Sequence, residues 1–298
     1  MGEWTVDGPE KISFDEPVDA LHVRIVGGAV NVVATEGPAR LEVGAIEGEP
    51  LLVTLADGVL TVAYKDLSWG EFTETVKSVQ SVKYFFASLR RKRRAQVSLA
   101  VPAGAEVRIG TVSADATVSG ITGPVAVHGA SGATTLVDLA GRIQANTVSG
   151  DIDAQSVSGE LKVNSVSGGL TVVAGTAETV QANSVSGAVT LDLDVRTPSD
   201  IKVTTVSGPV GIRLPSVADA RVEAGTTSGD LSSTFAELTV GGSWGAKRLS
   251  GQLGSGAGRL QVTTVSGAVT LLHRPDTGDE GPVLVKELPA GPDLTKEA

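Results

Sequence analysis

Apolar and polar residues alternate along short segments in the middle of this 298-residue chain. In Asp151-Ile152-Asp153-Ala154 and in Glu160-Leu161-Lys162-Val163, every second residue is apolar. This is the period of a β-strand with one buried face, and no window here has the three- and four-residue spacing of a helical repeat. The pattern predicts these inward-pointing residues: Val148, Ile152, Val157, Leu161, Val166 and Leu170.

A Ser-Gly motif recurs between these segments and indicates a repeat. Three nine-residue units that contain Val-Ser-Gly follow one another directly from Asn146 to Val172. The serine of the longer repeat occurs at positions 113, 131, 149, 167, 186, 207, 228, 250 and 266. Two strands and two bends form one coil, whose apolar row is buried only when the next coil stacks on it. The sequence predicts an all-β, single-stranded β-solenoid (β-helix-like) of about nine coils.

Two further columns of residues recur in phase with this repeat. Asn146, Asn164 and Asn183 predict a ladder of stacked side-chain amides. Glycine accepts backbone angles that are closed to other residues, and four glycines are expected at equivalent bends: Gly150, Gly168, Gly187 and Gly208.

Short apolar segments separated by Gly, Glu or Pro also occur before the repeats. They predict a β-rich module over residues 1–103 that covers the first coil, because an open solenoid end exposes unpaired strand edges. The solenoid repeats are expected over residues 104–273. Residues 274–298 are expected to form a C-terminal cap and a flexible, Pro-rich tail.

Residues 66–94 break the strand pattern. Ser68 and Glu71 fit a capping box, and apolar residues follow at helical spacing from Phe72 to Leu89. We expect an inserted amphipathic helix of about twenty residues, roughly 30 Å long. It ends in five consecutive cations, which are expected to lie on the surface.

Two interpretations of this helix remain open. It packs on its own solenoid, or it docks a protein partner, a second subunit or an anionic membrane surface. The candidate interaction residues are Trp69, Phe72, Phe85, Phe86, Arg90, Arg91, Lys92, Arg93 and Arg94.

Composition limits the cellular locations and the binding partners that are expected for this chain. The formal net charge of -10 disfavours nucleic acid as a partner, since phosphates are repelled. The chain has no cysteine, so disulfides and thiolate metal sites are not expected. Neither a signal-peptide pattern nor a long apolar run is present. The expected location is therefore the cytoplasm, with peripheral membrane contact as an extension.

The sequence contains little that predicts a catalytic site. His22, His128 and His273 are scattered, and no nucleophile motif accompanies them. We expect no enzyme activity, no metal and no cofactor. The alternative is a carbohydrate-active or carbohydrate-binding β-helix protein, for which Asp151, Asp153 and Glu160 could share one exposed face.

The run from Val97 to Ile109, leading into repeated Thr/Ser-Val-Ser-Gly units, resembles a widespread bacterial family. That family is known as a "putative adhesin" or as a domain of unknown function. The resemblance covers roughly residues 10 to 272 and implies a β-solenoid with no established catalysis. Together with the repeats, it favours a non-enzymatic scaffold or adhesin-like interaction module.

Overall fold

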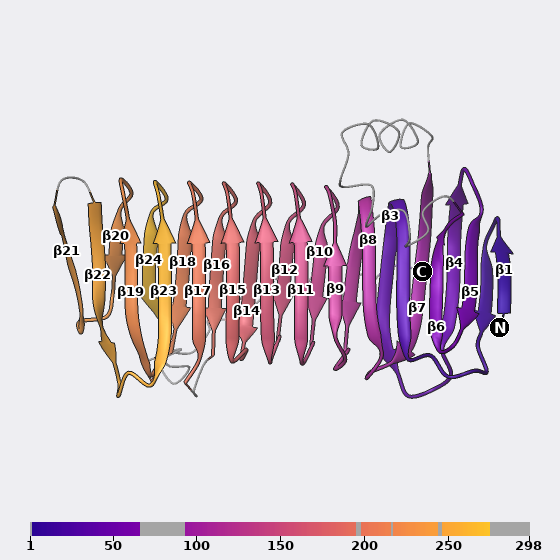
Figure 1. The fold of residues 1–298 in the computed structure, drawn as a ribbon, viewed down its shortest axis with the longest axis horizontal. Helices are drawn as coiled ribbons and strands as arrows, with labels where there is room; N and C mark the ends of the chain where they lie inside the picture. The colour runs from indigo at the N-terminus through magenta and orange to yellow at the C-terminus, as the bar shows by residue number, and fades with distance from the viewer. Residues whose placement is uncertain (1, 66–92, 195–197, 216, 244–245, 275–298) are drawn as a thin grey trace, which may run out of the picture.

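The structure is a computed structural model that describes residues 2–65, 93–194, 198–215, 217–243 and 246–274. These residues form 24 strands, which stack along one axis into an elongated body (Figure 1). The strands build two faces, here called A and B, that enclose the core between them. The molecule is a β-solenoid, and the predicted all-β class is confirmed.

Face A contains fourteen strands in spatial order. They are β1 (Gly2–Val6), β5 (Leu51–Ala56), β6 (Val59–Tyr64), β3 (Ala20–Thr35), β8 (Glu106–Ser119), β9 (Val125–His128), β11 (Arg142–Thr147), β13 (Glu160–Ser165), β15 (Thr179–Ser184), β17 (Asp200–Thr205), β23 (Gly258–Thr264), β19 (Ala220–Thr226), β22 (Ala246–Leu253) and β21 (Leu238–Ser243).

Face B shares β3 and β8, which are long enough to bend from one face into the other. Its strands in spatial order are β2 (Glu10–Ser13), β4 (Arg40–Glu47), β7 (Arg94–Pro102), β3, β8, β10 (Thr134–Val137), β12 (Ile152–Gln155), β14 (Leu170–Gly175), β16 (Val189–Leu193), β18 (Val210–Leu214), β24 (Val269–His273) and β20 (Leu231–Ser233).

The inward residues of both faces form one hydrophobic core, which is continuous from Val6 to Leu271. Ile152, Val157, Leu161 and Leu170 are all at most 3% exposed, as the alternation predicts. The prediction is wrong for Val148 and Val166, which are 53% and 46% exposed. The valine side chains of equivalent sequence motifs therefore do not all point inward.

The two bends of a coil differ, and this difference explains the error. Where β12 turns into β13, Ser156 and Gly159 have positive φ values of 54° and 84°, and Val157 between them points inward. Where β11 turns into β12, the strand alternation continues: Thr147 points inward and Val148 outward. Thr147 Oγ1 accepts a hydrogen bond from the Gly150 N–H at 3.0 Å, which satisfies the buried hydroxyl.

The four predicted bend glycines occupy equivalent positions, which confirms the repeat alignment. A Cβ at Gly150, Gly168, Gly187 or Gly208 would lie 1.9–2.0 Å from the carbonyl oxygen of the glycine one coil earlier. None of them has a positive φ. The reason for glycine at this bend is therefore the close approach of neighbouring backbones.

The predicted amide ladder is confirmed on the outer side of face A. The side chain of Asn183 donates to the Oδ1 of Asn164 at 2.9 Å, and Asn164 donates to Asn146 at 2.7 Å. Asn146 in turn contacts the Nδ1 of His128 at 3.1 Å. The ladder thus ends on an imidazole one coil before the first asparagine.

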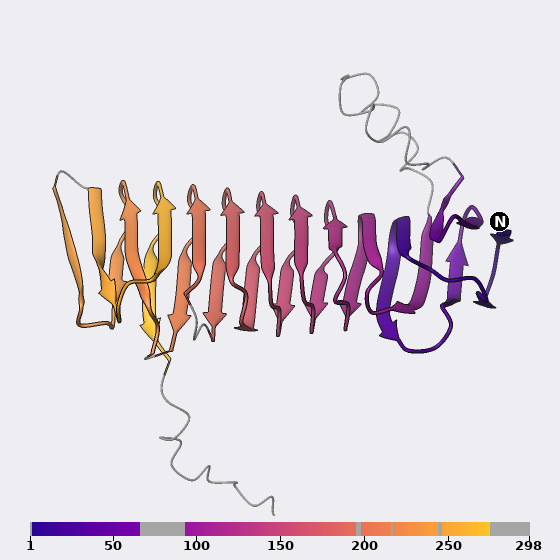
Figure 2. The ribbon, with the colours of Figure 1, turned by 60° about the horizontal axis from the view of Figure 1, so that its bottom comes forward.

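The coils at the C-terminal end are out of chain order. β23 pairs with β17 on one side and β19 on the other, and β24 lies likewise between β18 and β20. The last coil in the sequence therefore lies inside the stack, as the colours in Figure 2 show. The repeat predicts Ser250 at a bend, and this is wrong. Ser250 lies in β22, which pairs antiparallel with β19.

Antiparallel strands close the N-terminal end on both faces. β1 pairs with β5 on face A, and β2 pairs with β4 on face B. Phe14 and Tyr64 are buried at this end, and the ring of Trp4 lies edge-on to that of Phe14 at 5.3 Å. The predicted inserted helix lies outside the described residues except for Arg93 and Arg94.

Candidate interaction surfaces

Most of the predicted interaction residues lie outside the described part of the chain. These are Trp69, Phe72, Phe85, Phe86, Arg90, Arg91 and Lys92. Arg94 is exposed but is the first residue of β7, so the basic run extends into a strand. The prediction that all five cations lie on the surface is wrong for Arg93, which is only 5% exposed.

Arg93 directly precedes β7 and is buried beside the neighbouring strand β3. Arg94 pairs with Gly27, so Arg93 stands beside the buried Val26. A buried guanidinium needs a partner, and its Nη2 donates to Glu49 Oε2 at 2.6 Å. The guanidinium carbon also lies 5.2 Å from the centre of the Tyr64 ring. Tyr64 and Arg93, which flank the undescribed segment, are thus held together.

Outward valines form a column along one edge of the solenoid, here called the valine column. Its members and their exposed fractions are Val148 (53%), Val166 (46%), Val185 (47%), Val206 (47%) and Val265 (50%). The serine after each valine donates to the carbonyl of the residue at the valine position one coil earlier, as Ser167 does to Val148 at 3.1 Å. The valines are half covered by their neighbours, which accounts for their apolar character at a bend.

The carboxylates considered for carbohydrate chemistry do not converge. Asp153 lies on face B, whereas Glu160 lies on face A, where it accepts a hydrogen bond from Arg142 at 3.2 Å. Asp151 lies at the bend and accepts from the Gly169 N–H at 2.7 Å. The expectation that these three share one exposed face is wrong, because the chain changes face at each bend.

A basic cluster lies on the outer side of face A where β3, β8 and β9 meet. His22 pairs with Arg108, and Gly110 lies between Arg24 and His128. Arg24 is 7% exposed, and its side chain runs across Gly110, whose Cβ would lie 3.6 Å from the Arg24 Cγ. Burial, and then the charge of Arg108, lower the pKa of His22 and of His128. Both imidazoles are therefore biased towards the neutral form.

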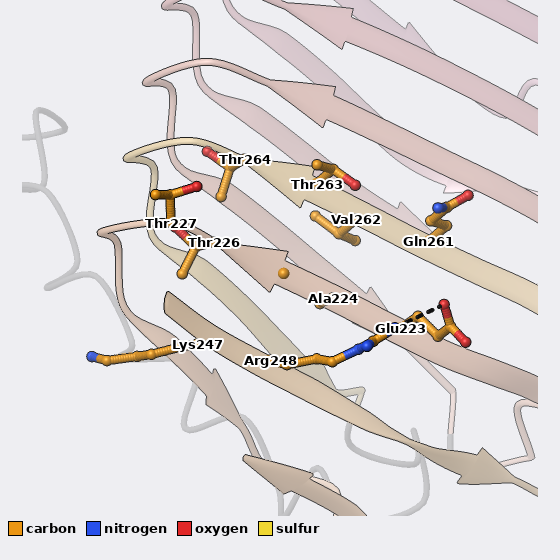
Figure 3. A pocket seen from close by; sticks show the side chains of 11 residues that line it. Glu223, Ala224, Thr226, Thr227, Lys247, Arg248, Gln261, Val262, Thr263 and Thr264 are labelled. Atoms are coloured by element: carbon orange, nitrogen blue, oxygen red, sulfur yellow. Dashed lines mark ion pairs between the residues drawn. The ribbon is translucent and has the colours of Figure 1, made fainter. Parts of the chain in front are cut away.

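A shallow hollow of about 330 Å³ lies on face A near the C-terminal end (Figure 3). Its floor is Gly225 in β19, which pairs with Arg248 in β22 and with Thr263 in β23. An outward strand position without a side chain leaves a notch between its two neighbours, and a Cβ there would meet nothing within 4 Å. The hollow is a consequence of one glycine in an otherwise polar row.

The groups around the hollow are polar and planar. Glu223 and Gln261 stand beside each other, and the Arg248 guanidinium lies 3.7 Å from the Glu223 carboxylate. Lys247 points away and pairs with Asp230, whose pKa it lowers through a hydrogen bond and its charge. The sequence alone does not predict this hollow, since β19 is separated along the chain from β22 and β23, which lie on its two sides.

The described residues offer no metal centre and no membrane-spanning helix. Within them, no three His, Cys, Asp or Glu side chains are grouped as a metal ion would require. Over the same ranges, no helix is long and apolar enough to cross a bilayer.

The stacked, two-faced architecture defines a β-solenoid protein. The chain belongs to the Toastrack DUF4097 family, whose model matches residues 23–272. This confirms the family that the Thr/Ser-Val-Ser-Gly repeats predict. None of the curated proteins compared with the chain matches it.

Several solved structures are similar to the chain at low sequence identity. A "putative cell adhesion protein" from Clostridium sporogenes is 11% identical, with 89% of this chain and 100% of that chain covered and a TM-score of 0.23. A "putative adhesin" from Parabacteroides merdae is 13% identical, with 89% and 95% covered and a TM-score of 0.38. A "putative lipid binding protein" from Parabacteroides distasonis is 13% identical, with 90% and 97% covered and a TM-score of 0.42.

Proposed function

We propose that this protein is a non-enzymatic, adhesin-like scaffold that binds a protein partner through residues 66–94. The observation that carries the proposal is the attachment of this segment. Tyr64, just before the segment, and Arg93, near its other end, are 1% and 5% exposed and contact each other, and Arg93 pairs with Glu49. The scaffold therefore holds the described residues on the two sides of residues 66–92 close together.

The composition of the segment supports binding to an acidic and apolar surface. It contains five of the ten aromatic residues of the chain, and Arg90, Arg91 and Lys92 follow them. Aromatic and arginine side chains are enriched where proteins bind one another. An acidic partner would also be steered by these cations, in contrast to the net charge of -10 of the whole chain.

Two variants of the full chain test this proposal. One changes Trp69, Phe72 and Phe86 to Ser, and the other changes Arg90, Arg91 and Lys92 to Glu. A captured partner is purified and titrated against wild type and both variants at two salt concentrations. We expect both variants to bind at least about tenfold more weakly, and binding of the wild type to weaken with salt.

Retained binding by both variants would overturn the proposal. Co-sedimentation with vesicles of anionic phospholipid is the parallel measurement. If the wild type binds such vesicles and the charge variant does not, the segment docks a membrane surface, and the protein partner is the wrong assignment.

Carbohydrate binding is the second candidate, and the hollow at Gly225 is the feature that favours it. Glu223, Gln261 and Arg248 are planar polar groups of the kind that hydrogen-bond to sugar hydroxyls. A Gly225→Val variant fills the notch without a clash, since its Cβ has open space. Binding to a glycan array by the wild type and not by Gly225→Val would support this candidate, whereas equal binding by both would remove it.

A further inference from the structure

Strand β21 is an edge of face A. Of the described strands, it pairs with β22 alone, so the backbone groups on its other side face away from the sheet. Figure 1 shows β21 as the last strand at the C-terminal end of the stack. Such an edge is a template for a further strand, and natural proteins usually protect it.

β21 lacks the protection that the other sheet edges have. β1 carries Glu3, β2 carries Glu10 and Lys11, and β20 is only three residues long. β21 is six residues long and has neither a charged residue nor a proline. Charge, proline and short length are the usual features that prevent edge-to-edge pairing.

Val240 leaves an apolar side chain uncovered on this edge. It pairs with Leu249, which pairs with Ala224, and both of these are buried. Directly paired residues share a face of the sheet, so Val240 lies on the core side. It is nevertheless 52% exposed, because the stack ends here.

We propose that β21 pairs antiparallel with β21 of a second copy, so that two solenoids join end to end through one continuous face A. A two-fold axis at Val240 places the two exposed valines opposite each other. The same register sets Leu238 against Gly242 of the second copy and Thr239 against Gly241. Each pair then lies on one face of the joint sheet, as strand geometry requires.

A second copy fits this edge because the strand is complementary to itself. The larger Leu238 and Thr239 each meet a glycine, and a Cβ at Gly241 would have open space around it. No like charges face each other within the strand. A two-fold interface of this kind closes on itself, so the product is a dimer rather than a fibre.

Cross-linking tests the register in a chain that has no natural cysteine. Residues directly opposite in an antiparallel pair have Cα atoms about 4.5–5.5 Å apart, which a disulfide can span. We expect Val240→Cys to form a covalent dimer under mild oxidation. The matched control is Val217→Cys, at a residue that is 65% exposed elsewhere and should cross-link far less.

Analytical ultracentrifugation of the full chain tests the dimer itself. We expect a concentration-dependent dimer whose dissociation constant rises at least about tenfold in Val240→Lys, because like charges then face each other. Thr239→Lys should raise it less, because its lysine faces Gly241 of the second copy rather than another lysine, and Val217→Lys should leave it unchanged. A wild type that is monomeric at all concentrations would overturn the proposal. So would a dimer that survives Val240→Lys, or cross-linking of Val240→Cys no faster than that of Val217→Cys. The dimer does not depend on residues 66–94, which attach at the other end of the stack.

Discussion

At Gly168 the neighbouring coil lies so close that a Cβ would be 1.9 Å from the carbonyl oxygen of Gly150. The same contact recurs along the column, up to Gly229 against Gly267 at 2.0 Å. Because the obstacle is backbone, it cannot rotate away as a side chain could. The bend tolerates only hydrogen at this position.

Gly168→Ala should therefore destabilise the fold by about 3 kcal/mol through overpacking. Gly211→Ala is the control, because a Cβ there meets nothing within 4 Å, and its effect should stay within about 0.5 kcal/mol. Urea denaturation of both variants measures the difference. Equal stability of the two would show that the coils do not stack as closely as described.

Ile152→Asp and Val148→Asp separate the inward and outward phases of one coil. Ile152 is 1% exposed, so a carboxylate there is buried without a partner and should cost several kcal/mol, about 3 or more. Val148 is 53% exposed, so its carboxylate stays in water and the cost should be below about 1 kcal/mol. Thermal melting of the two variants gives the comparison, and a large loss in Val148→Asp would contradict the outward assignment.

His128 should make stability depend on pH. Burial and Arg108 lower its pKa, so the unfolded chain, with an ordinary histidine pKa of about 6.5, binds the proton more readily. Stability is therefore fully present above about pH 6.5 and falls as the pH drops below it. Protonation of Nδ1 also removes the acceptor that faces the Asn146 amide at 3.1 Å.

His128→Asn extends the amide ladder and removes the titrating group. The free energy of unfolding should fall less between pH 7.5 and 5.5 in this variant than in the wild type. Because His22 also has a lowered pKa, part of the pH dependence should remain. An unchanged pH dependence in His128→Asn would assign the effect to His22 or other groups.

At the scale of strands and bends, sequence reasoning works where the pattern and the backbone agree. Alternation correctly places Ile152, Leu161 and Leu170 in the core. It fails at Val148 because the tripeptide Val-Ser-Gly occurs at both bends of a coil. Only the bend between β12 and β13 has positive φ values, at Ser156 and Gly159. Identical tripeptides carry no information on which bend they form.

The order of the C-terminal coils could not be predicted from the repeat. The motif predicts one bend at Ser228 and another at Ser266, but it does not indicate which of them stacks on the bend at Ser207. In the structure, Ser266 donates to Val206, and Ser228 donates to Val265. The hollow at Gly225 was missed for the same reason, since β23 reaches β19 only through this rearrangement.

Truncation should show the importance of the inserted coil. A chain that ends at Ser255 lacks β23 and β24, so β19 to β22 lose the two strands that join them to β17 and β18. We expect rapid hydrogen exchange throughout residues 220–253 and retained protection in β11 to β16. A chain that ends at Arg274 is the control and should keep both regions protected.

In a solenoid stacked in chain order, removal of the last coil would expose only its neighbour. Retained protection of residues 220–253 in the chain that ends at Ser255 would therefore contradict the described strand order.

At the scale of the whole molecule, the two ends of the stack are built differently. The N-terminal end is closed by antiparallel strands with Phe14 and Tyr64 beneath them, and it holds the segment proposed to bind a partner. The C-terminal end carries the bare edge of β21. Between them lies one continuous core, so a partner bound at one end and a second copy at the other would be held at a fixed separation.

The position of β23 and β24 also bears on how the protein is made. A ribosome releases β19 to β22 before residues 258–273, so these strands emerge before β23 and β24, which join them to β17 and β18. Their sheet edges remain unpaired until the last coil is synthesised and takes its place beside β17 and β18. During that interval the nascent chain has several open sheet edges, which makes the final stage of its synthesis the time of greatest risk of aggregation.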